Sequence, residues 1–194
     1  MKSFAFAVVA GLGAALSLVG CTPPDNSANS SSRNSTNESP SVFKDSSPLV
    51  ATVILSPATG SNVRGTVNFF QSKDTVRVEA SLTGLTPGLH GFHIHEKGDC
   101  SVPDASSAGG HFNPTGKQHG APTDASRHTG DFGNLEADAQ GNARYAQSFP
   151  DLKLDGANSI LGKAVIVHAK ADDLKTQPSG DAGERVACGV IEKK

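Results

Sequence analysis

Short runs in which apolar and polar residues alternate constrain the fold of this chain more than any other feature. In TVRVEASL, at residues 75–82, the side chains of Val76, Val78, Ala80 and Leu82 share one face when the chain is extended. A period of two is typical of β-strands with one buried face. The same pattern predicts further strands over residues 50–55, 64–71, 90–96, 133–137, 142–149, 164–170 and 185–191. Eight strands with almost no helical pattern predict an all-β fold, an antiparallel sandwich or flattened barrel.

Composition favours a single loop-rich domain without a nucleic-acid partner. The 194 residues include 21 Gly and 11 Pro but no Trp, and the formal net charge is -2. That charge offers no basic footprint for nucleic acid. Two segments, residues 97–132 and 171–184, lack a strand pattern and are long for loops of a compact domain. The first contains three of the seven histidines, which favours a functional loop over disorder.

The N-terminus is predicted to be an export signal. Lys2 is followed by an apolar run over residues 4–19 that ends in LVGC, at residues 18–21. The run is too short and too weakly flanked for a membrane span, and it is typical of a secretory signal. LVGC resembles a bacterial lipobox, which implies that residues 1–20 are removed as a signal peptide and that Cys21 is lipidated. An ordinary signal peptide with an incidental cysteine is the alternative.

Residues 21–48 are predicted to form a flexible, lipid-anchored tether. Residues 22–41 are rich in Ser, Asn and Pro and nearly free of large apolar side chains. Such a segment buries too little apolar surface to offset the chain entropy that is lost on ordering. The folded domain is therefore expected over residues 49–194, a common length for one domain.

The three cysteines are expected to have two different roles. With Cys21 assigned to the lipid, Cys100 and Cys188 remain as a pair in an exported chain. Exported proteins fold in oxidising surroundings, where a disulfide between the two is the simplest interpretation. Two free thiols are the alternative.

Two histidines one residue apart point to a metal site. In GFHIH, at residues 91–95, Phe92 and Ile94 share one face of an extended chain, and His93 and His95 share the other. Imidazole suits both zinc and copper, and carboxylate suits zinc. The chain has seven histidines, and none lies before residue 90: His90, His93, His95, His111, His119, His128 and His168. Asp131 follows His128 by three residues. A metal cluster is the leading hypothesis, and scattered surface histidines are the alternative.

Five fragments together carry a resemblance to a known family. They are GLHGFHIHEKGD, GGHFNP, RHTGDFGNL, VIVHAKADDL and GERVACGVI, and they fall in order between residues 49 and 191. In this arrangement the chain resembles copper,zinc superoxide dismutase. The resemblance implies an eight-stranded Greek-key barrel of immunoglobulin-like sandwich architecture. It also implies an enzyme that converts two superoxide anions and protons to dioxygen and hydrogen peroxide.

The resemblance further implies two metal sites that share one residue. The implied copper ligands are His93, His95, His111 and His168. The implied zinc ligands are His111, His119, His128 and Asp131, so that His111 bridges the two metals. Copper cycles between Cu(II) and Cu(I), whereas zinc has no redox chemistry and is expected to order the bridging ring and its loop.

Three more residues receive expected roles. The resemblance implies that Asp172 links the copper ligand His93 to the zinc ligand His119, and that Arg185 binds the superoxide anion beside copper. A solvated aspartate and an ordinary surface arginine are the alternatives. His90 is left over from the ligand set and is expected to be a structural, hydrogen-bonded histidine.

The chain also departs from the family pattern. Residues 172–185 form a short segment, so charge guidance of the substrate is expected to be weaker or to fall to Lys170 and Lys175. The family includes homodimers and monomers, and both stay open. Because Thr22 and not aspartate follows Cys21, the outer membrane facing the periplasm is the expected location, with a Gram-positive surface as the alternative. A non-catalytic copper-binding or copper-delivery domain of the same fold is the rival function.

Overall fold

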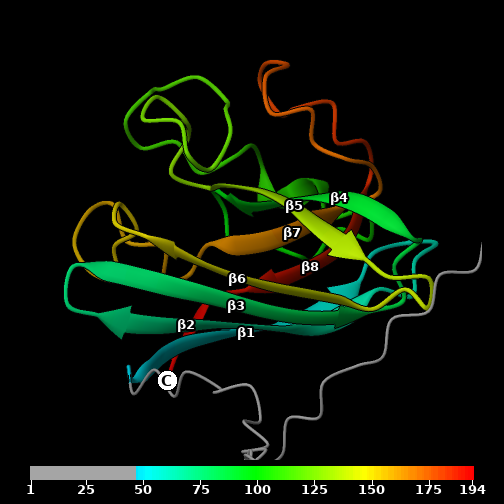
Figure 1. The fold of residues 1–194 in the computed structure, drawn as a ribbon, viewed down its shortest axis with the longest axis horizontal. Helices are drawn as coiled ribbons and strands as arrows, with labels where there is room; N and C mark the ends of the chain where they lie inside the picture. Colours follow the sequence, from blue (N-terminus) through cyan, green and yellow to red (C-terminus); the bar gives the residue numbers. More distant parts are fainter. Residues whose placement is uncertain (1–46) are drawn as a thin grey trace, which may run out of the picture. The chain divides into compact units, whose positions relative to one another are not determined.

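A computed structural model describes residues 47–194, which form an all-β unit (Figure 1). The predicted signal peptide at residues 1–20, the predicted lipidation site Cys21 and almost all of the predicted tether lie outside the described residues. Among residues 47–194, no helix is long and apolar enough to cross a membrane.

All eight predicted strands are present, most with ends shifted by one or two residues. They are β1 Leu49–Pro57, β2 Arg64–Ser72, β3 Thr75–Thr83, β4 Gly88–His95, β5 Asp131–Ala137, β6 Ala143–Phe149, β7 Ala164–His168 and β8 Arg185–Val190, followed by the short β9 Glu192–Lys193 and interrupted by one 3-10 turn, Ser106–Ala108. Strand β5 begins earlier than predicted because Asp131 pairs with His93 of β4. Strand β7 ends earlier because its register with β8 shifts between Val167 and His168.

The strands close into a barrel. Every pair of neighbouring strands is antiparallel, and the order is β2-β3-β6-β5-β4-β7-β8-β1, with β1 pairing again with β2. The pairs β3–β6 and β4–β7 join strands that are not consecutive in the chain, which is the Greek-key connection. Figure 1 shows β1, β2, β3 and β6 on one side of the barrel and β4, β5, β7 and β8 on the other. The predicted fold is confirmed.

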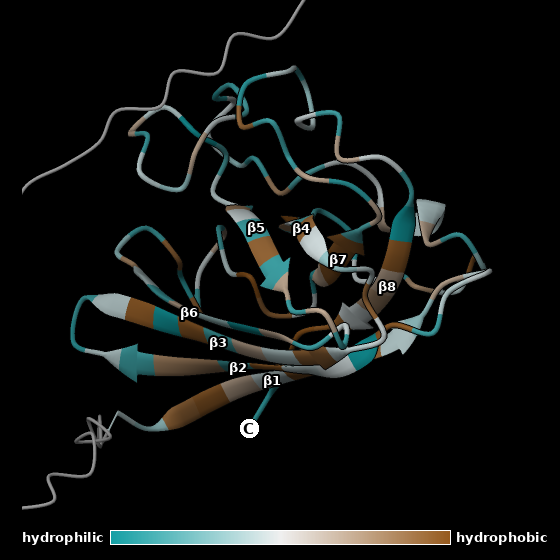
Figure 2. Ribbon diagram, turned by 45° about the vertical axis from the view of Figure 1, so that its right-hand side comes forward, coloured by the Kyte–Doolittle hydropathy of each residue, from teal (hydrophilic) through white to brown (hydrophobic). Residues whose placement is uncertain are grey.

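The barrel interior is filled by the inward-facing side of the alternating pattern. Val76 and Val78 of β3 are buried, while their neighbours on the same strand are less so. Phe132 packs at its centre, with ring centroids 5.3 Å from Phe92 and 4.7 Å from Phe149. Figure 2 shows the resulting apolar segments along the strands, in contrast to the more polar loops.

Two long loops rise from the same side of the barrel and carry most of the remaining chemistry. Loop 96–130 joins β4 to β5, and loop 169–184 joins β7 to β8. Both extend above β4, β5 and β7 in Figure 1. Arg127 ties the first loop to the barrel, because its guanidinium donates to the carbonyl of His128 at 2.6 Å and to Asp151 at 2.7 Å. It also lies 5.2 Å above the ring of Phe149.

Candidate metal centre

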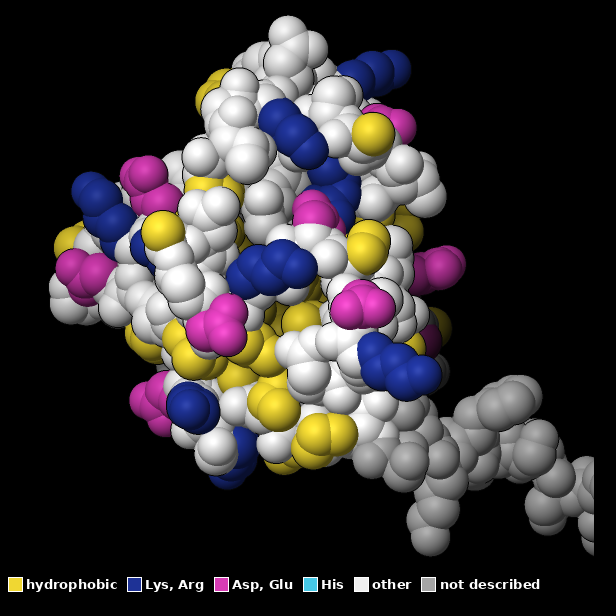
Figure 3. Space-filling view, turned by 90° about the vertical axis from the view of Figure 1, so that its left-hand side faces the viewer, with side chains coloured by type: hydrophobic (Ala, Val, Ile, Leu, Met, Phe, Trp, Pro, Cys, Tyr) yellow, Lys and Arg dark blue, Asp and Glu magenta, His cyan; other side chains and the backbone are white. Residues whose placement is uncertain are grey.

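Strand β4 separates core residues from histidines. Phe92 and Ile94 are fully buried in the barrel core, as the alternation predicted. His93 and His95 face the other way but are also almost completely buried, because the two long loops cover that side of the strand. All seven histidines are buried, and none is visible on the face in Figure 3, where hydrophobic side chains gather among Lys, Arg, Asp and Glu.

One group of four histidines, the first group, brings together residues from two strands and one loop. It consists of His93, His95, His111 and His168. One candidate ligand atom from each lies within 4.8 Å of the others. His111 enters the group because its main chain forms an isolated β-bridge with His95, at the start of the long loop. The ring centroids of His93 and His111 are 4.1 Å apart.

A second group adjoins the first and shares His111 with it. It consists of His111, His119, His128 and Asp131. The Nδ1 atoms of the three histidines lie 2.8, 3.1 and 3.3 Å, in that order, from Oδ1 of Asp131. The other carboxylate oxygen accepts hydrogen bonds from the main-chain N–H of Gly120 at 3.1 Å and of His128 at 3.0 Å. Three nitrogens and one oxygen thus converge, a donor set that zinc accepts.

The unpaired nitrogens in these groups fit metal ions. Six buried ring nitrogens have no hydrogen-bond partner within residues 47–194: Nδ1 of His93, Nε2 of His95, Nε2 of His111, Nδ1 of His119, Nδ1 of His128 and Nε2 of His168. Buried polar atoms are nearly always paired, so a cluster of unpaired ones needs a reason. Metal ions that accept these lone pairs would satisfy all six, so the residues fit the implied metals.

Hydrogen-bond acceptors next to the histidine rings determine which ring nitrogen carries the proton and which keeps its lone pair. Nδ1–H of His95 donates to the carbonyl of Gly109 at 2.8 Å, and Nδ1–H of His168 donates to the carbonyl of Gly183 at 3.1 Å. A neutral imidazole carries one N–H, so each of these bonds leaves the opposite nitrogen as a lone-pair donor. The tautomer of each ring is therefore determined by the main chain around it.

Asp172 connects the two groups, as the resemblance implied. Its carboxylate accepts from Nε2 of His93 at 2.7 Å and from Nε2 of His119 at 2.8 Å. Burial acts to raise the pKa of Asp172, but the hydrogen bonds from His119 and His93 outweigh it and hold that pKa well below its usual range. The buried carboxylate is therefore ionised and orients one ring of each group.

Burial also sets the charge of the rings. It lowers the pKa of His93 to about 4, against the opposing effect of the bond to Asp172, and it lowers the pKa of His168 to about 3. These rings are neutral at pH 7, the form in which imidazole binds a metal. His119 differs: burial lowers its pKa, but the nearby carboxylates of Asp131 and Asp172 outweigh burial and raise that pKa to about 9.

Arg185 lies at the wall of the cavity that leads to the first group. Its guanidinium donates to the carbonyls of Ala105 at 2.5 Å and Gly109 at 2.6 Å. The cavity is lined by His95, Gly110, His111, Asn113, His128, His168, Pro178, Ser179, Gly183 and Arg185. Arg185 is the only permanently charged residue in this set, and neither Lys170 nor Lys175 belongs to it.

The remaining sequence predictions concern His90 and the cysteines. His90 belongs to neither group; its ring is hydrogen-bonded to the carbonyls of His168 and Thr86, each at 2.8 Å. The disulfide between Cys100 and Cys188 is confirmed, with Cα atoms 5.8 Å apart. It joins the long loop to β8, three residues beyond Arg185.

Sequence reasoning missed two side chains that support the site. Asn134 holds the main chain of Asp172 with two hydrogen bonds, accepting at 2.8 Å and donating at 2.9 Å. Gln177 makes a similar pair of bonds to the main chain of His119. Asn134 is a polar residue inside a predicted strand, which could have drawn attention to it. Nothing in the sequence around Gln177 indicates its contact, because the partner lies 58 residues away.

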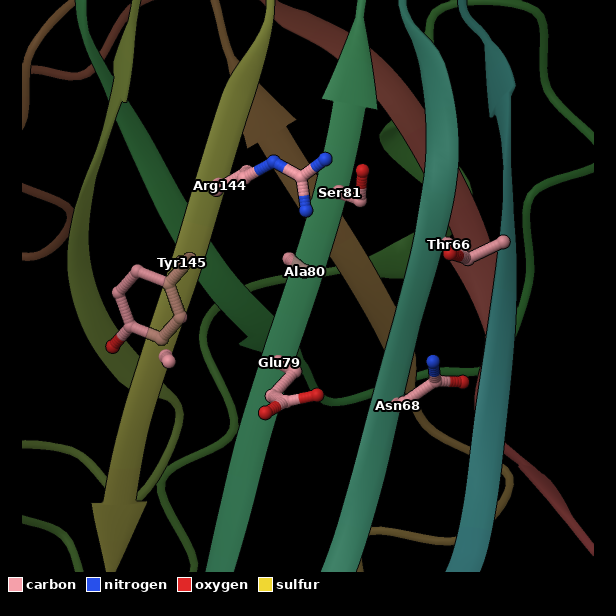
Figure 4. Close-up of a pocket in the computed structure, with 8 residues that line it drawn as sticks. Thr66, Asn68, Glu79, Ala80, Ser81, Arg144 and Tyr145 are labelled. Carbon is pink, nitrogen blue, oxygen red and sulfur yellow. The ribbon is translucent and has the colours of Figure 1, made fainter. Parts of the chain in front are cut away.

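A separate groove lies on the outer face of β2, β3 and β6, away from the histidines (Figure 4). Thr66, Asn68, Glu79, Ser81 and Arg144 line it. Figure 4 shows the Arg144 side chain extending across β3 toward Ser81. The lining contains neither His nor Cys, so the groove is not a second metal site of the same kind.

Fold and site together define a class of protein: a Greek-key barrel with two adjoining groups of residues that could each hold a metal ion and that share one histidine. The family described as copper/zinc superoxide dismutase (SODC) matches residues 63–191, more than half of the chain. The chain belongs to this family. It is therefore an oxidoreductase of the superoxide dismutase class, with copper and zinc as its cofactors.

Individual proteins show the same relationship. The chain is 45% identical over 139 residues to an extracellular Cu-Zn superoxide dismutase of Brugia pahangi, covering 67% of this chain and 69% of that protein. It is 48% identical over 137 residues to Cu-Zn superoxide dismutase 2 of Mesembryanthemum crystallinum, covering 67% and 87%. The crystal structure of the clock protein EA4 is similar, with a TM-score of 0.68, 43% identity and coverage of 75% of this chain and 95% of that one.

Proposed function

We propose that this protein removes superoxide with copper held by the first group and zinc held by the second. In this assignment His93, His95, His111 and His168 hold copper, and His111, His119, His128 and Asp131 hold zinc. The observation that carries the assignment is the set of six buried, unpaired ring nitrogens. Four belong to the first group and two to the second, and Nδ1 of the shared His111 faces Asp131 while its Nε2 is unpaired.

Arg185 and His111 perform the protein's part of the reaction in this proposal. Copper, when bound, would supply one-electron redox chemistry, by which two superoxide anions and two protons become dioxygen and hydrogen peroxide. Arg185 stays charged at every relevant pH, and two of its five N–H donors are used by the carbonyls of Ala105 and Gly109. The others are available to an anion in the cavity. When it is not bound to copper, Nε2 of His111 is the atom at which the chain would hold a proton for the product.

The first experiment compares the protein loaded with copper and zinc with the same protein loaded with zinc alone. We expect superoxide consumption only when copper is present, because zinc has no redox chemistry. Pulse radiolysis or a cytochrome reduction assay measures the rate. Tight copper binding without turnover would contradict the enzyme and support the rival copper-delivery function.

Arg185 should account for most of the electrostatic guidance. We expect Arg185→Gln to slow turnover by roughly 10- to 100-fold, the equivalent of the 1.5–3 kcal/mol typical of a hydrogen bond to a charged group. The wild-type rate should fall as ionic strength rises, since the Debye length shrinks from about 30 Å at 0.01 M to about 8 Å at 0.15 M. The variant should lose most of that salt dependence.

The matched control for Arg185 is Lys175→Gln, which removes a positive charge from a residue outside the cavity lining. It should change the rate by less than about twofold, because Lys175 is exposed and the charge of an exposed side chain is screened by salt. Equal salt slopes for wild type and Arg185→Gln would refute the role given to Arg185 and return the guidance to the lysines.

We also propose that the protein is exported and anchored to a membrane by a lipid on Cys21. The extracellular description of one relative and the disulfide both agree with export. The lipobox-like LVGC supports the anchor, with residues 1–20 as the signal peptide and residues 21–48 as the tether. Thr22 favours the outer membrane facing the periplasm. Homodimer and monomer both stay predictions, which sedimentation equilibrium distinguishes.

Replacement of Cys21 tests the anchor. When the full chain is expressed in a bacterium, we expect the wild type in the detergent phase of a two-phase extraction and Cys21→Ser in the aqueous phase. Mass spectrometry of the wild-type N-terminus should find a diacylglyceryl group on the cysteine. An unmodified Cys21 in a water-soluble mature protein would instead support the ordinary signal peptide.

A further inference from the structure

The side-chain amide of Gln177 is hydrogen-bonded to both main-chain groups of His119, its N–H and its carbonyl. Its Oε1 accepts a hydrogen bond from the His119 N–H at 2.8 Å, and its Nε2 donates to the His119 carbonyl at 2.9 Å. Two residues facing each other in an antiparallel ladder exchange the same two bonds. The second N–H of the amide donates to the carbonyl of Lys175 at 3.1 Å, so all groups of this side chain that can donate are used.

His119 depends on loop 169–184 more than the other members of the second group do. Its ring nitrogen Nε2 is held by Asp172, and its main chain by Gln177, both from that loop. Gly180 of the same loop packs directly against Asp172 and the His119 ring, so closely that a Cβ there would overlap them. One segment therefore sets both the position of the His119 main chain and the rotation of its ring.

The main chains of the other residues of the second group are held by the barrel strands or by residues next to them. His111 forms a β-bridge with His95, and Asp131 is the first residue of β5. The main-chain N–H of His128 donates to Asp131. His119 lies in the part of loop 96–130 that has no strand pairing. Without the amide of Gln177, both main-chain hydrogen-bonding groups of His119 would have to find other partners.

We propose that Gln177 is a positioning residue that holds His119 in its ligand geometry before and after the metal binds. This inference rests on the proposed function, in which His119 is a zinc ligand. Preorganised ligands bind a metal more tightly, because less conformational entropy is lost on binding. Gln177 thus couples the short loop 169–184 to retention of zinc.

The test compares two glutamine-to-methionine variants that differ only in which glutamine is replaced. Gln177→Met keeps the length of the side chain and removes both hydrogen bonds to His119. Gln177 lies at the surface, so an apolar replacement meets no core packing. Gln118→Met is the matched control, because Gln118 directly precedes His119 and its side chain makes no hydrogen bond within residues 47–194.

Two measurements do not require turnover. The first is release of zinc from the loaded protein to a chromogenic chelator; we expect Gln177→Met to release it about 10-fold faster, at the low end of the 10- to 100-fold effects typical of residues that orient ligands. The second is hydrogen exchange of the His119 amide in metal-free protein, which should accelerate by at least the same factor. Gln118→Met should change neither by more than about twofold.

A third variant separates positioning from general loosening of the loop. Gln177→Glu keeps an acceptor for the His119 N–H but cannot donate to its carbonyl. We expect it to restore protection of the His119 amide while zinc release stays faster than in the wild type. The visible spectrum of cobalt bound in place of zinc should shift in Gln177→Met and not in Gln118→Met.

The outcomes separate this inference from the proposed function. Wild-type zinc release and wild-type His119 exchange in Gln177→Met would overturn the role of Gln177, whatever the enzymatic activity. If Gln177→Met loosens the whole barrel, hydrogen exchange will rise in every strand. The role of Gln177 is then decided by Gln177→Glu. If the His119 amide is not protected again in that variant, the inference is overturned. Failure of the wild type to bind zinc would overturn the proposed zinc site, while the exchange measurement would still test Gln177.

Discussion

Replacement of His168 with alanine is expected to abolish superoxide consumption while the barrel stays folded. His168 is the last residue of β7, and its unpaired Nε2 faces the first group. Loss of one of four proposed copper ligands should reduce turnover by more than about 100-fold, because even residues that only orient ligands cost 10- to 100-fold. The buried hydrophobic residues that fill the barrel are unchanged in this variant, so its far-UV circular dichroism should keep the wild-type β-sheet signal.

His128→Ala is the matched comparison, since it removes a histidine of the second group. Zinc is expected to contribute more to ordering loop 96–130 than to turnover, so this variant should keep most of its activity when copper is loaded. Its loop should exchange hydrogen faster, because Asp131 loses one of three imidazole neighbours. Near wild-type activity in His168→Ala would contradict the copper assignment.

Removal of the disulfide should give the largest loss of stability. Cys100 and Cys188 are 88 residues apart, and a crosslink that closes a loop of this length restricts the unfolded chain strongly. The double variant Cys100→Ser, Cys188→Ser is expected to lower the free energy of unfolding by about 2–5 kcal/mol. Urea denaturation at equilibrium measures this difference.

The same variant should also lose activity. The disulfide joins β8, which carries Arg185, to the loop that supplies the Ala105 and Gly109 carbonyls to its guanidinium. Reduction of the wild type with a phosphine is the control, and it should reproduce the loss of stability without any substitution. An unchanged denaturation midpoint in both experiments would show that packing of Cys188 with Ala105, Ala108 and Ile166 alone holds the loop.

The strands could be predicted because local pattern and tertiary environment agree. Val76, Val78, Ala80 and Leu82 alternate in the chain and are all buried in the barrel. The strand ends were less accurate, because they depend on partners in other strands, as with Asp131 beside His93. The predicted ligands also lie together. They could be predicted because their residue types, and the sequence fragments that contain them, are recognisable without coordinates.

The sequence by itself determined the β-barrel, the disulfide pair and, through the family resemblance, which residues to expect in the two candidate metal-binding groups. Only the tertiary structure decided which nitrogen of each ring is free, because that depends on acceptors such as Gly109 and Gly183 that come from other segments. It also decided that Gln177 holds His119, a contact between loops far apart in the chain. Hydrogen bonds of this kind form where folding brings two segments together, and neither segment alone carries a pattern that records the other.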